Sequence, residues 1–424
     1  MTEKICVVGL GYVGIPVAAK FAEAGYNVVG IDVDRKKIEK INQGVFPLKG
    51  EEPGMKELVE GVVKEGKLKA SLDYDECKDA DFILVSVQTP MKGDVPDYSF
   101  LKGAVEEVGK RLKKGCLISI ESTLAPKTMV NIVKSVLEKE SGMKAGEDFY
   151  LVHCPERVRP GHLLYQLENF NRVIGAINKE SGEKAKEFYS KIVKGNLDVT
   201  DMTSAELVKT IENTYRDVQI AFANEMALIC EKLGADVYDV RKLVNKCPWR
   251  DMYTPGAGVG GHCIPKDSRL LAHSVSGVYE PTFIREARRI NNYMPHHVVD
   301  LVKENLKEKN PKVSILGMAF VKDTEDTRNS PSLVIIEELK KGLFEVEAYD
   351  PYAEGYSDFE SCLKNSDCLV LATDHAEFRK LNTSGELEKI KKLMRTPLIV
   401  DGRNLFDKKL CEEMGFVYKG IGKG

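Results

Sequence analysis

Short apolar runs recur along the first part of the chain, and segments with helical periodicity lie between them. Each run ends in a polar turn, which is typical of buried strands. The runs that we predict to be strands are residues 4–8, 27–31, 82–87, 116–121 and 149–153. An amphipathic helix is predicted between the first two runs, and Gly25 closes it. Strands that alternate with helices predict a parallel sheet.

A second alternating series occupies the last part of the chain. Its predicted strands are residues 312–316, 346–349, 368–372 and 398–400. Between the two series, residues 203–233 have an unbroken helical pattern, which at 1.5 Å per residue would extend roughly 45 Å. Another long helix is predicted over residues 280–308.

These patterns predict an α/β protein with two Rossmann-like, doubly wound parallel-sheet domains joined by a long central helix. The predicted boundaries are residues 1–200, 201–308 and 309–424, and two or three domains suit a chain of 424 residues. We expect the long helix to link the two halves and to carry a subunit interface.

Composition excludes several classes of partner. A net charge of −3 argues against nucleic acid or an anionic membrane as the main partner. No apolar run approaches the roughly 20 residues that a membrane span needs, and the N-terminus enters a strand pattern without a signal peptide.

The ten cysteines are scattered, with neither paired CxxC spacing nor the Cys and His spacing of a metal site. We therefore expect reduced thiols in a cytoplasmic protein without a bound metal. Cys6, Cys116, Cys154 and Cys230 lie in apolar runs and are expected in the core.

A glycine fingerprint follows the first predicted strand directly. Gly9, Gly11 and Gly14 form a G-x-G-x-x-G turn that opens a helix, and Asp32 ends the next strand. In this setting the glycines permit a tight turn and close approach of a pyrophosphate, which the helix N-terminus attracts. A carboxylate at Asp32 would bind ribose hydroxyls and repel a 2′-phosphate, so NAD is favoured over NADP. The basic residues just after it, among them Lys37, weaken that preference.

Polar residues follow three further predicted strands of the first half. Ligands of open α/β sheets collect at the carboxyl ends of the strands, so Thr89, Thr123 and Glu156 are candidate site residues. Thr123 has an alternative role as a helix cap ahead of Pro126.

The long helix carries a polar stripe. Glu206, Lys209, Asn213 and Arg216 recur at steps of three and four residues and therefore share one face. Such a stripe is either solvated or a buried functional face, and the apolar neighbouring positions leave both open.

A glycine-rich segment, YTPGAGVGGHCIPKD, spans residues 253–267. Its glycines let backbone amides approach a ligand closely, and Cys263 at its end is a candidate nucleophile with Asp267 close behind. The alternative is a glycine-rich turn followed by an ordinary half-buried cysteine.

An NAD site together with a nucleophilic cysteine predicts more than alcohol oxidation. An aldehyde donates hydride readily only after a nucleophile adds to it, so the prediction is a four-electron oxidation of a primary alcohol to a carboxylate, through a thiohemiacetal and a thioester on Cys263. Lys209 and Asn213 suit oxyanion stabilisation, with Lys209 also a proton-transfer group, and Asp267 would orient Lys209 or water. The predicted catalytic residues are Cys263, Lys209, Asn213, Asp267, Glu156 and Thr123.

Two other functions remain open from the residues alone. One is a two-electron dehydrogenase in which Cys263 is structural, and the other is a sensor that binds NAD and a sugar nucleotide without turnover. In the second half of the chain, Lys322, Arg328 and Arg403 are cationic candidates for phosphate binding.

Six motifs in order resemble those of the UDP-glucose/GDP-mannose 6-dehydrogenase family. They are GLGYVG, ESTLAPKT, HCPERVRPG, ELVKTIENTYRD, GAGVGGHCIPKD and FVKDTEDTRNSPS. The resemblance implies NAD in the first Rossmann-like domain, a UDP-sugar at the second, and a homodimer or higher oligomer formed through the long helix. It also implies Cys263 as nucleophile and Lys209 as acid/base residue.

The resemblance further implies the contacts of both ligands. The NAD positions, with the fingerprint included, are Gly9, Gly11, Tyr12, Val13, Gly14, Asp32, Lys37, Thr89, Thr123 and Arg328. The substrate positions are Arg157, Val158, Lys209, Asn213, Arg216, Arg250, Tyr253, Gly260, Lys322 and Arg403.

Within the family, PERVRPG, IENTYRDVQIAFANE and GGHC are similar to the branch that oxidises UDP-N-acetylhexosamines. UDP-N-acetyl-D-mannosamine is therefore the expected substrate. CPWRDMYTPGAG and IPKDS depart from the pattern of that branch, so UDP-N-acetylglucosamine and UDP-glucose remain alternatives.

Overall fold

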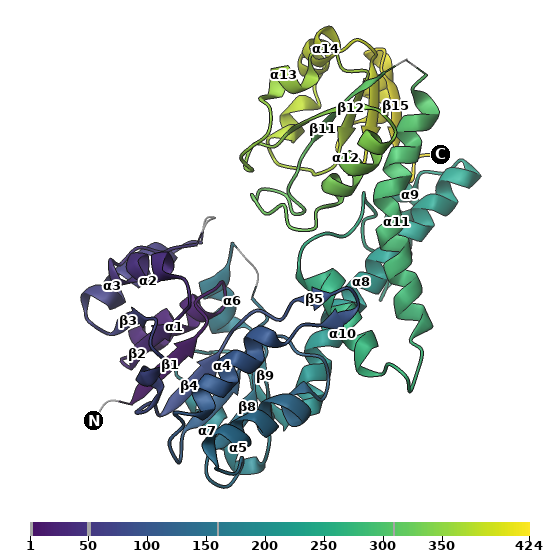
Figure 1. The fold of residues 1–424 in the computed structure, drawn as a ribbon. Coiled ribbons are helices and arrows are strands. Elements are labelled where there is room, and N and C mark those ends of the chain that lie inside the picture. Colours follow the sequence, from purple (N-terminus) through teal and green to yellow (C-terminus); the bar gives the residue numbers. More distant parts are fainter. Residues whose placement is uncertain (1–2, 49–51, 159–160, 308–309) are drawn as a thin grey trace. The chain divides into compact units, whose positions relative to one another are not determined.

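The computed structural model describes residues 3–48, 52–158, 161–307 and 310–424, which form two compact units (Figure 1). The first unit comprises residues up to 212 together with 269–279, and the second comprises 213–268 and 280–424. Two helices, α8 (Met202–Leu233) and α10 (Cys263–Ser274), cross the division. The predicted long helix is thus confirmed as α8.

The first unit contains an eight-stranded sheet in the order β10-β9-β8-β7-β4-β1-β2-β3. Its strands are β1 (Lys4–Val8), β2 (Asn27–Ile31), β3 (Leu68–Ser71), β4 (Phe82–Val85), β7 (Leu117–Ile120), β8 (Tyr150–His153), β9 (Arg172–Ala176) and β10 (Leu197–Asp201). All pairs are parallel except β8 with β9, which is antiparallel. The predicted parallel-sheet Rossmann-like fold is confirmed, with this one antiparallel pair in addition. A small hairpin, β5 (Met91–Lys92) with β6 (Val95–Pro96), is separate from the sheet.

Helices cover both faces of this sheet because its strands are apolar on both sides. In β1, Ile5 and Val7 belong to one core cluster and Cys6 and Val8 to the other. The first cluster packs against α1 (Gly14–Glu23), α2 (Arg35–Asn42), α3 (Met55–Lys64), α6 (Leu163–Asn169) and α7 (Lys179–Tyr189). The second packs against α4 (Ser99–Gly109) and α5 (Ser135–Ser141).

The second unit has a five-stranded parallel sheet in the order β12-β11-β13-β14-β15. Its strands are β11 (Lys312–Leu316), β12 (Glu345–Tyr349), β13 (Cys368–Leu371), β14 (Leu398–Asp401) and β15 (Val417–Gly420). One face packs against α11 (Thr282–Asn305) and α12 (Pro331–Lys341), and the other against α13 (Phe359–Leu363), α14 (Ser384–Leu393) and α15 (Lys408–Glu413). A short helix, α9 (Val237–Val244), follows α8.

Helix α11 is shorter than predicted. It begins after Pro281 and ends at Asn305, and the predicted last residue, 308, lies outside the described residues. The four cysteines expected in the core are all buried. Across the ranges that the structure describes, no helix combines the length and apolar character that a bilayer crossing needs.

Candidate active site

The glycine turn after β1 has the features of a dinucleotide site. Gly9 has φ +93°, and a side chain on Gly9 or Gly14 would collide with backbone oxygens of Ser86 or Gly9. A Cβ on Gly11 would meet nothing within 4 Å, so that face is open for a ligand's approach. Helix α1 begins without a side-chain cap. Its first amides therefore suit a pyrophosphate, and the residues present fit NAD.

Asp32 is held as a carboxylate at the end of β2. Its oxygens accept hydrogen bonds from the backbone nitrogens of Leu10 at 2.8 Å and Asp34 at 3.0 Å, and from Lys37 Nζ at 2.7 Å. Burial alone would raise the pKa of Asp32, but these bonds outweigh it and lower the pKa. Because the Lys37 ammonium pairs with Asp32, its charge is already compensated, which favours NAD over NADP.

The loops that follow β4 and β7 are joined by a hydrogen bond. Thr89 Oγ1 donates to the Thr123 carbonyl at 2.8 Å. The helical segment beyond Thr123 begins at Met129 behind Thr128, so the helix-cap alternative for Thr123 is wrong. The amides of Lys127 and Met129 instead donate to the buried Glu206 carboxylate of α8 at 2.6 and 2.7 Å. The stripe on α8 is therefore partly buried, and Glu206 fixes the Thr123 segment to the helix that carries Lys209.

Glu156 lies in a buried ion-pair cluster after β8. Its carboxylate pairs with the Arg172 guanidinium and accepts the amides of Arg157 at 2.6 Å and Val158 at 3.1 Å. Arg172 Nη2 also lies 3.2 Å from Glu121 Oε2. We refer to Glu121, Glu156 and Arg172 as the Arg172 cluster. It fixes the loop that carries Arg157 and Val158; residues 159 and 160 of that motif lie outside the described residues.

Arg157 connects this loop to α8. Its Nε donates to Glu212 at 3.0 Å and its Nη1 to the Asn171 carbonyl at 2.9 Å. Lys209, one turn before Glu212, is half-buried on the same helix. The first unit thus contains Lys209 and the predicted positions of the Gly9–Gly14 turn, Asp32, Thr89, Thr123, Glu156 and Arg157. The structure joins Thr89 to Thr123 and Glu156 to Arg157 directly.

In the second unit the glycine-rich segment leads directly into α10, whose first residue is Cys263. The Cys263 side chain is exposed, so the alternative of a half-buried cysteine is wrong. Gly260 and Gly261 have no room for a Cβ, because Phe320, Asn329 and Pro331 pack directly against them.

Backbone bonding fixes the position of this segment. Gly261 N donates to the Arg328 carbonyl at 3.0 Å. The segment containing Lys322 and Arg328 is thereby held beside the nucleophile loop.

Asp267 is buried one turn beyond Cys263 and accepts a hydrogen bond from Asn213 Nδ2 at 2.6 Å. Lys266 Nζ lies 3.6 Å from its other oxygen. Asn213 and Asp267, two of the predicted catalytic residues, are therefore in contact, although the sequence had suggested Lys209 or water as the partner of Asp267. His262 directly precedes Cys263 and was not among the residues predicted from the sequence. Burial, with the charges of Lys266 and Arg328, lowers the pKa of His262, which keeps the imidazole neutral.

A buried polar chain, also missed from the sequence, braces the nucleophile loop. Asn224 Oδ1 accepts the Gly256 amide at 2.9 Å, and its Nδ2 donates to Asn291 Oδ1 at 2.9 Å. Asn291 in turn donates to the Asp217 carboxylate at 2.7 Å, and so does Arg288 Nη1. The only signal in the sequence is polar residues at otherwise apolar positions of α8 and α11.

The remaining ligand candidates of the second unit, of which Arg328 was predicted to contact NAD and the others the substrate, differ in their surroundings. Arg403 lies against Gly256 and donates from Nε to the Ala372 carbonyl at 2.8 Å, and burial lowers its pKa. Arg328 forms a forked pair with Asp326. Arg216 and Tyr253 are half-buried, whereas Lys322 and Arg250 are exposed.

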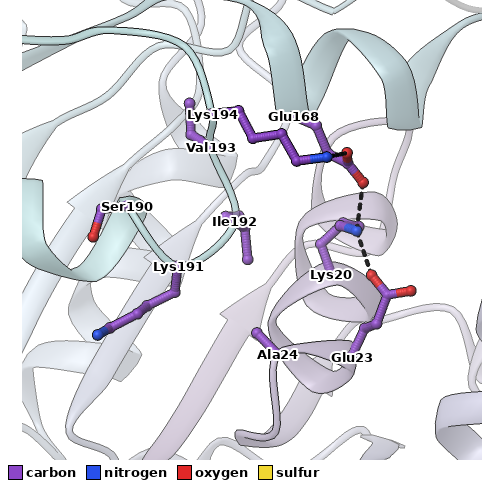
Figure 2. A pocket seen from close by; sticks show the side chains of 9 residues that line it. All are labelled: Lys20, Glu23, Ala24, Glu168, Ser190, Lys191, Ile192, Val193 and Lys194. Carbon is purple, nitrogen blue, oxygen red and sulfur yellow. Dashed lines mark hydrogen bonds and ion pairs between the residues drawn. The ribbon is translucent and has the colours of Figure 1, made fainter.

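A surface pocket lies elsewhere in the first unit. Figure 2 shows Lys20 between Glu23 and Glu168, with Lys194 also on Glu168 at 2.8 Å. None of the predicted site residues lines this pocket. Among the described residues, no group of His, Cys, Asp and Glu is arranged to hold a metal.

Sequence models of three domains of one family match the chain. They are the NAD binding domain of the UDP-glucose/GDP-mannose dehydrogenase family over residues 3–193, its central domain over 203–293 and its UDP binding domain over 314–408. The chain belongs to this family. It is an NAD-dependent nucleotide-sugar dehydrogenase.

Relatives match over the full length. The chain is 40% identical to the UDP-N-acetyl-D-mannosamine dehydrogenase of Pyrococcus horikoshii, with 99% of each covered. A solved structure of the P. horikoshii UDP-D-ManNAc dehydrogenase has a TM-score of 0.93 at 40% identity, with all of both chains covered. The NDP-N-acetyl-D-galactosaminuronic acid dehydrogenase of Methanosarcina mazei Go1 has a TM-score of 0.89 at 38% identity, covering 100% of this chain and 95% of that one.

Proposed function

We propose that this dehydrogenase oxidises the C6 alcohol of UDP-N-acetyl-D-mannosamine to the carboxylate through covalent catalysis by Cys263. The observation that carries the proposal is the exposed thiol at the first residue of α10, on a braced glycine loop beside buried Asp267. Structural cysteines are usually buried, as Cys230 and Cys368 are, and the other exposed cysteine of the described residues, Cys247, lies outside the glycine loop.

The reaction has two oxidations and a hydrolysis. The alcohol loses a proton and a hydride to give an aldehyde. The Cys263 thiolate adds to the aldehyde carbon, and the resulting thiohemiacetal loses a second hydride to become a thioester. Water then displaces the thiol and leaves the carboxylate. In total, the alcohol, water and two NAD give the carboxylate, two NADH and three protons; bound NAD supplies the hydride acceptor each time.

The chain's own residues move the protons and stabilise the oxyanions. Lys209 takes the alcohol proton, and Asn213, held by Asp267, donates to the oxygen that becomes negative when the thiolate adds. The first amides of α10 are further donors for that oxygen. Thr123 and Glu156 position the hydrolytic water. We assign the first 200 residues to NAD, 201–308 to catalysis and dimerisation, and 309–424 to the UDP-sugar.

The choice of sugar rests on the relatives. The P. horikoshii relative is named for UDP-N-acetyl-D-mannosamine, which matches the branch that the motifs resemble. The M. mazei relative is named for an N-acetyl-galactosaminuronic acid product, so another N-acetylhexosamine is the second candidate. The unpaired cysteines fit a reducing, cytoplasmic setting.

The deciding experiment counts NADH per sugar consumed with UDP-N-acetyl-D-mannosamine, UDP-N-acetylglucosamine and UDP-glucose in turn. We expect two NADH with the first sugar and a UDP-linked carboxylate as product. Two NADH with a different sugar would preserve the chemistry and replace the substrate. One NADH with a trapped aldehyde would refute the covalent mechanism.

We also propose that α8 forms a dimer interface. Tyr215, Phe222 and Ile229 recur every seven residues on α8 and are 62%, 54% and 44% exposed. Trp249 is 95% exposed in the loop that carries Arg250. Apolar side chains at such spacing form a seam that a second copy of the helix would cover.

The double substitution Tyr215→Glu, Phe222→Glu should convert the dimer to a monomer. Two carboxylates from each copy, four in all, would otherwise be buried where the two helices meet. Light scattering would give the mass of the wild type and of the variant. Tyr165→Glu, at a similarly exposed residue of α6, should leave the mass unchanged. A dimeric Tyr215→Glu, Phe222→Glu variant would exclude α8 as the interface.

A further inference from the structure

The glycine turn of the second unit is closed by its own side chains. Gly317 follows β11 with φ +92°, as Gly9 follows β1. The next two amides, of Met318 and Ala319, donate to Asp350 Oδ2 at 2.6 and 3.0 Å. Asp350 follows β12 and its side chain is fully buried. These amides are therefore already bonded, and a nucleotide phosphate at this unit needs another partner.

His375 connects this turn to the next segment of the chain. It is fully buried four residues after β13, and its Nε2 lies 3.0 Å from Asp350 Oδ2. Burial would raise the pKa of Asp350, but the bonds from His375 and four amides lower it to about 2, so the group is a carboxylate that only accepts. Nε2 consequently carries the proton, and the lone pair of Nδ1 accepts the Asp323 amide at 2.8 Å.

The bond to Asp323 has a reciprocal partner. Asp323 Oδ1 accepts the amide of Ala376 at 2.7 Å, so the two segments are bonded in both directions. We call these two bonds the Asp323–His375 clasp. Asp323 has φ +58°, a left-handed conformation that a residue with a side chain adopts only where its surroundings hold it. The clasp supplies that restraint.

Lys322 directly precedes Asp323 and is exposed. Within the described residues, no ion pair involves its ammonium group. On the other side of the same segment, Phe320 packs on Gly260 and Gly261, and the Gly261 amide bonds to the Arg328 carbonyl. The clasp restrains the backbone directly after Lys322, whereas the contact with the nucleophile loop is formed by other residues, Phe320 and Arg328.

We propose that His375 is a positioning residue that aims Lys322 at the diphosphate of the nucleotide sugar. The proposal rests on the proposed function, which assigns Lys322 to the substrate. Since the clasp and the loop contacts are independent, loss of the clasp weakens substrate binding and leaves the chemistry at Cys263 in place.

Two variants separate the two bonds of His375. In His375→Asn the side-chain oxygen takes the place of Nδ1 and still accepts the Asp323 amide. In His375→Gln the terminal amide takes the place of Nε2, still donates to Asp350, and leaves the Asp323 amide without its acceptor. We expect His375→Gln to raise the KM for the UDP-sugar and the Kd for UDP about tenfold, the size of one lost charged phosphate contact. The kcat and the KM for NAD should stay within about twofold of wild type, and His375→Asn should restore most of the affinity.

Asp367→Asn is the matched control for a general loss of stability. Asp367 is fully buried just before β13, the other end of that strand from His375, and bonds Arg395 and the Lys312 amide. It should lower the melting temperature without changing the Kd for UDP, measured by calorimetry. Equal UDP affinity in His375→Gln and Asp367→Asn, or equal loss in the Gln and Asn variants, would overturn the proposal. Lys322→Ala tests the underlying assignment: if it binds UDP as wild type does, the phosphate role of Lys322 fails as well.

Discussion

Cys263→Ala should lower the rate of carboxylate formation by at least about a thousandfold, the usual scale for loss of a covalent nucleophile. Without the thiolate the aldehyde has no adduct from which a second hydride can leave. The first oxidation uses Lys209 and does not need sulfur, so a trace of aldehyde should form and be reduced back. Mass spectrometry of the UDP-linked carboxylate, with NADH absorbance in parallel, would measure both.

Cys247→Ala is the matched control, because Cys247 is the other exposed cysteine of the described residues. It lies outside the glycine loop, and its removal should leave kcat within about twofold of wild type. If Cys263→Ala still made carboxylate at the wild-type rate, the thiol would be structural. The position of Cys263 at the start of α10 would then have no catalytic meaning.

Much of this site could be predicted from the sequence because its signals are local. The Gly9–Gly14 turn joins an apolar strand to a helix, and β1, β2 and β11 have the predicted bounds because each is an uninterrupted apolar run between turns. Edge strands gave no such signal. The residues of β10 are half-buried or exposed, and β3 alternates with polar positions, so neither was predicted.

The groups that hold the site could not be predicted, because their partners are far apart in the sequence. Arg172 pairs with Glu156, which is 16 positions away in the sequence, and with Glu121, which is 51 positions away. Asn291 bonds to Asp217, which is 74 positions away. From the sequence alone, these polar side chains would be expected at the surface, and only the folded structure shows that they are buried and hydrogen-bonded. Glu156 illustrates the difference: its place after a strand was visible, whereas its buried partner was not.

Arg172→Met should destabilise the first unit by about 3–5 kcal/mol, since it leaves Glu121 and Glu156 buried without their cation. Arg172 is 2% exposed, and the Tyr189 ring lies against its guanidinium at 4.9 Å. The single tryptophan, Trp249, is in the second unit and cannot report on this change. Hydrogen exchange of the β7 and β8 amides is the suitable measurement, and it should become roughly 10²- to 10⁴-fold faster.

The pH dependence of that variant distinguishes unpaired charge from lost packing. Burial already raises the pKa of Glu121, and removal of Arg172 raises it further. A folded-state pKa above the unfolded value of 4.5 means that the folded state binds more protons. The loss of unfolding free energy in Arg172→Met, relative to wild type, should therefore become smaller as pH falls from 7 towards about 4.5.

Arg111→Met in the same unit removes an arginine paired with Asp75 and Glu107 near the surface. It should lower the free energy of unfolding by no more than about 1 kcal/mol, and this loss should not become smaller at low pH. A deficit in Arg172→Met that stays constant with pH would mean that the cluster acts through packing. The Glu156 loop would then owe its position to the fold around it, not to the buried charge of Arg172.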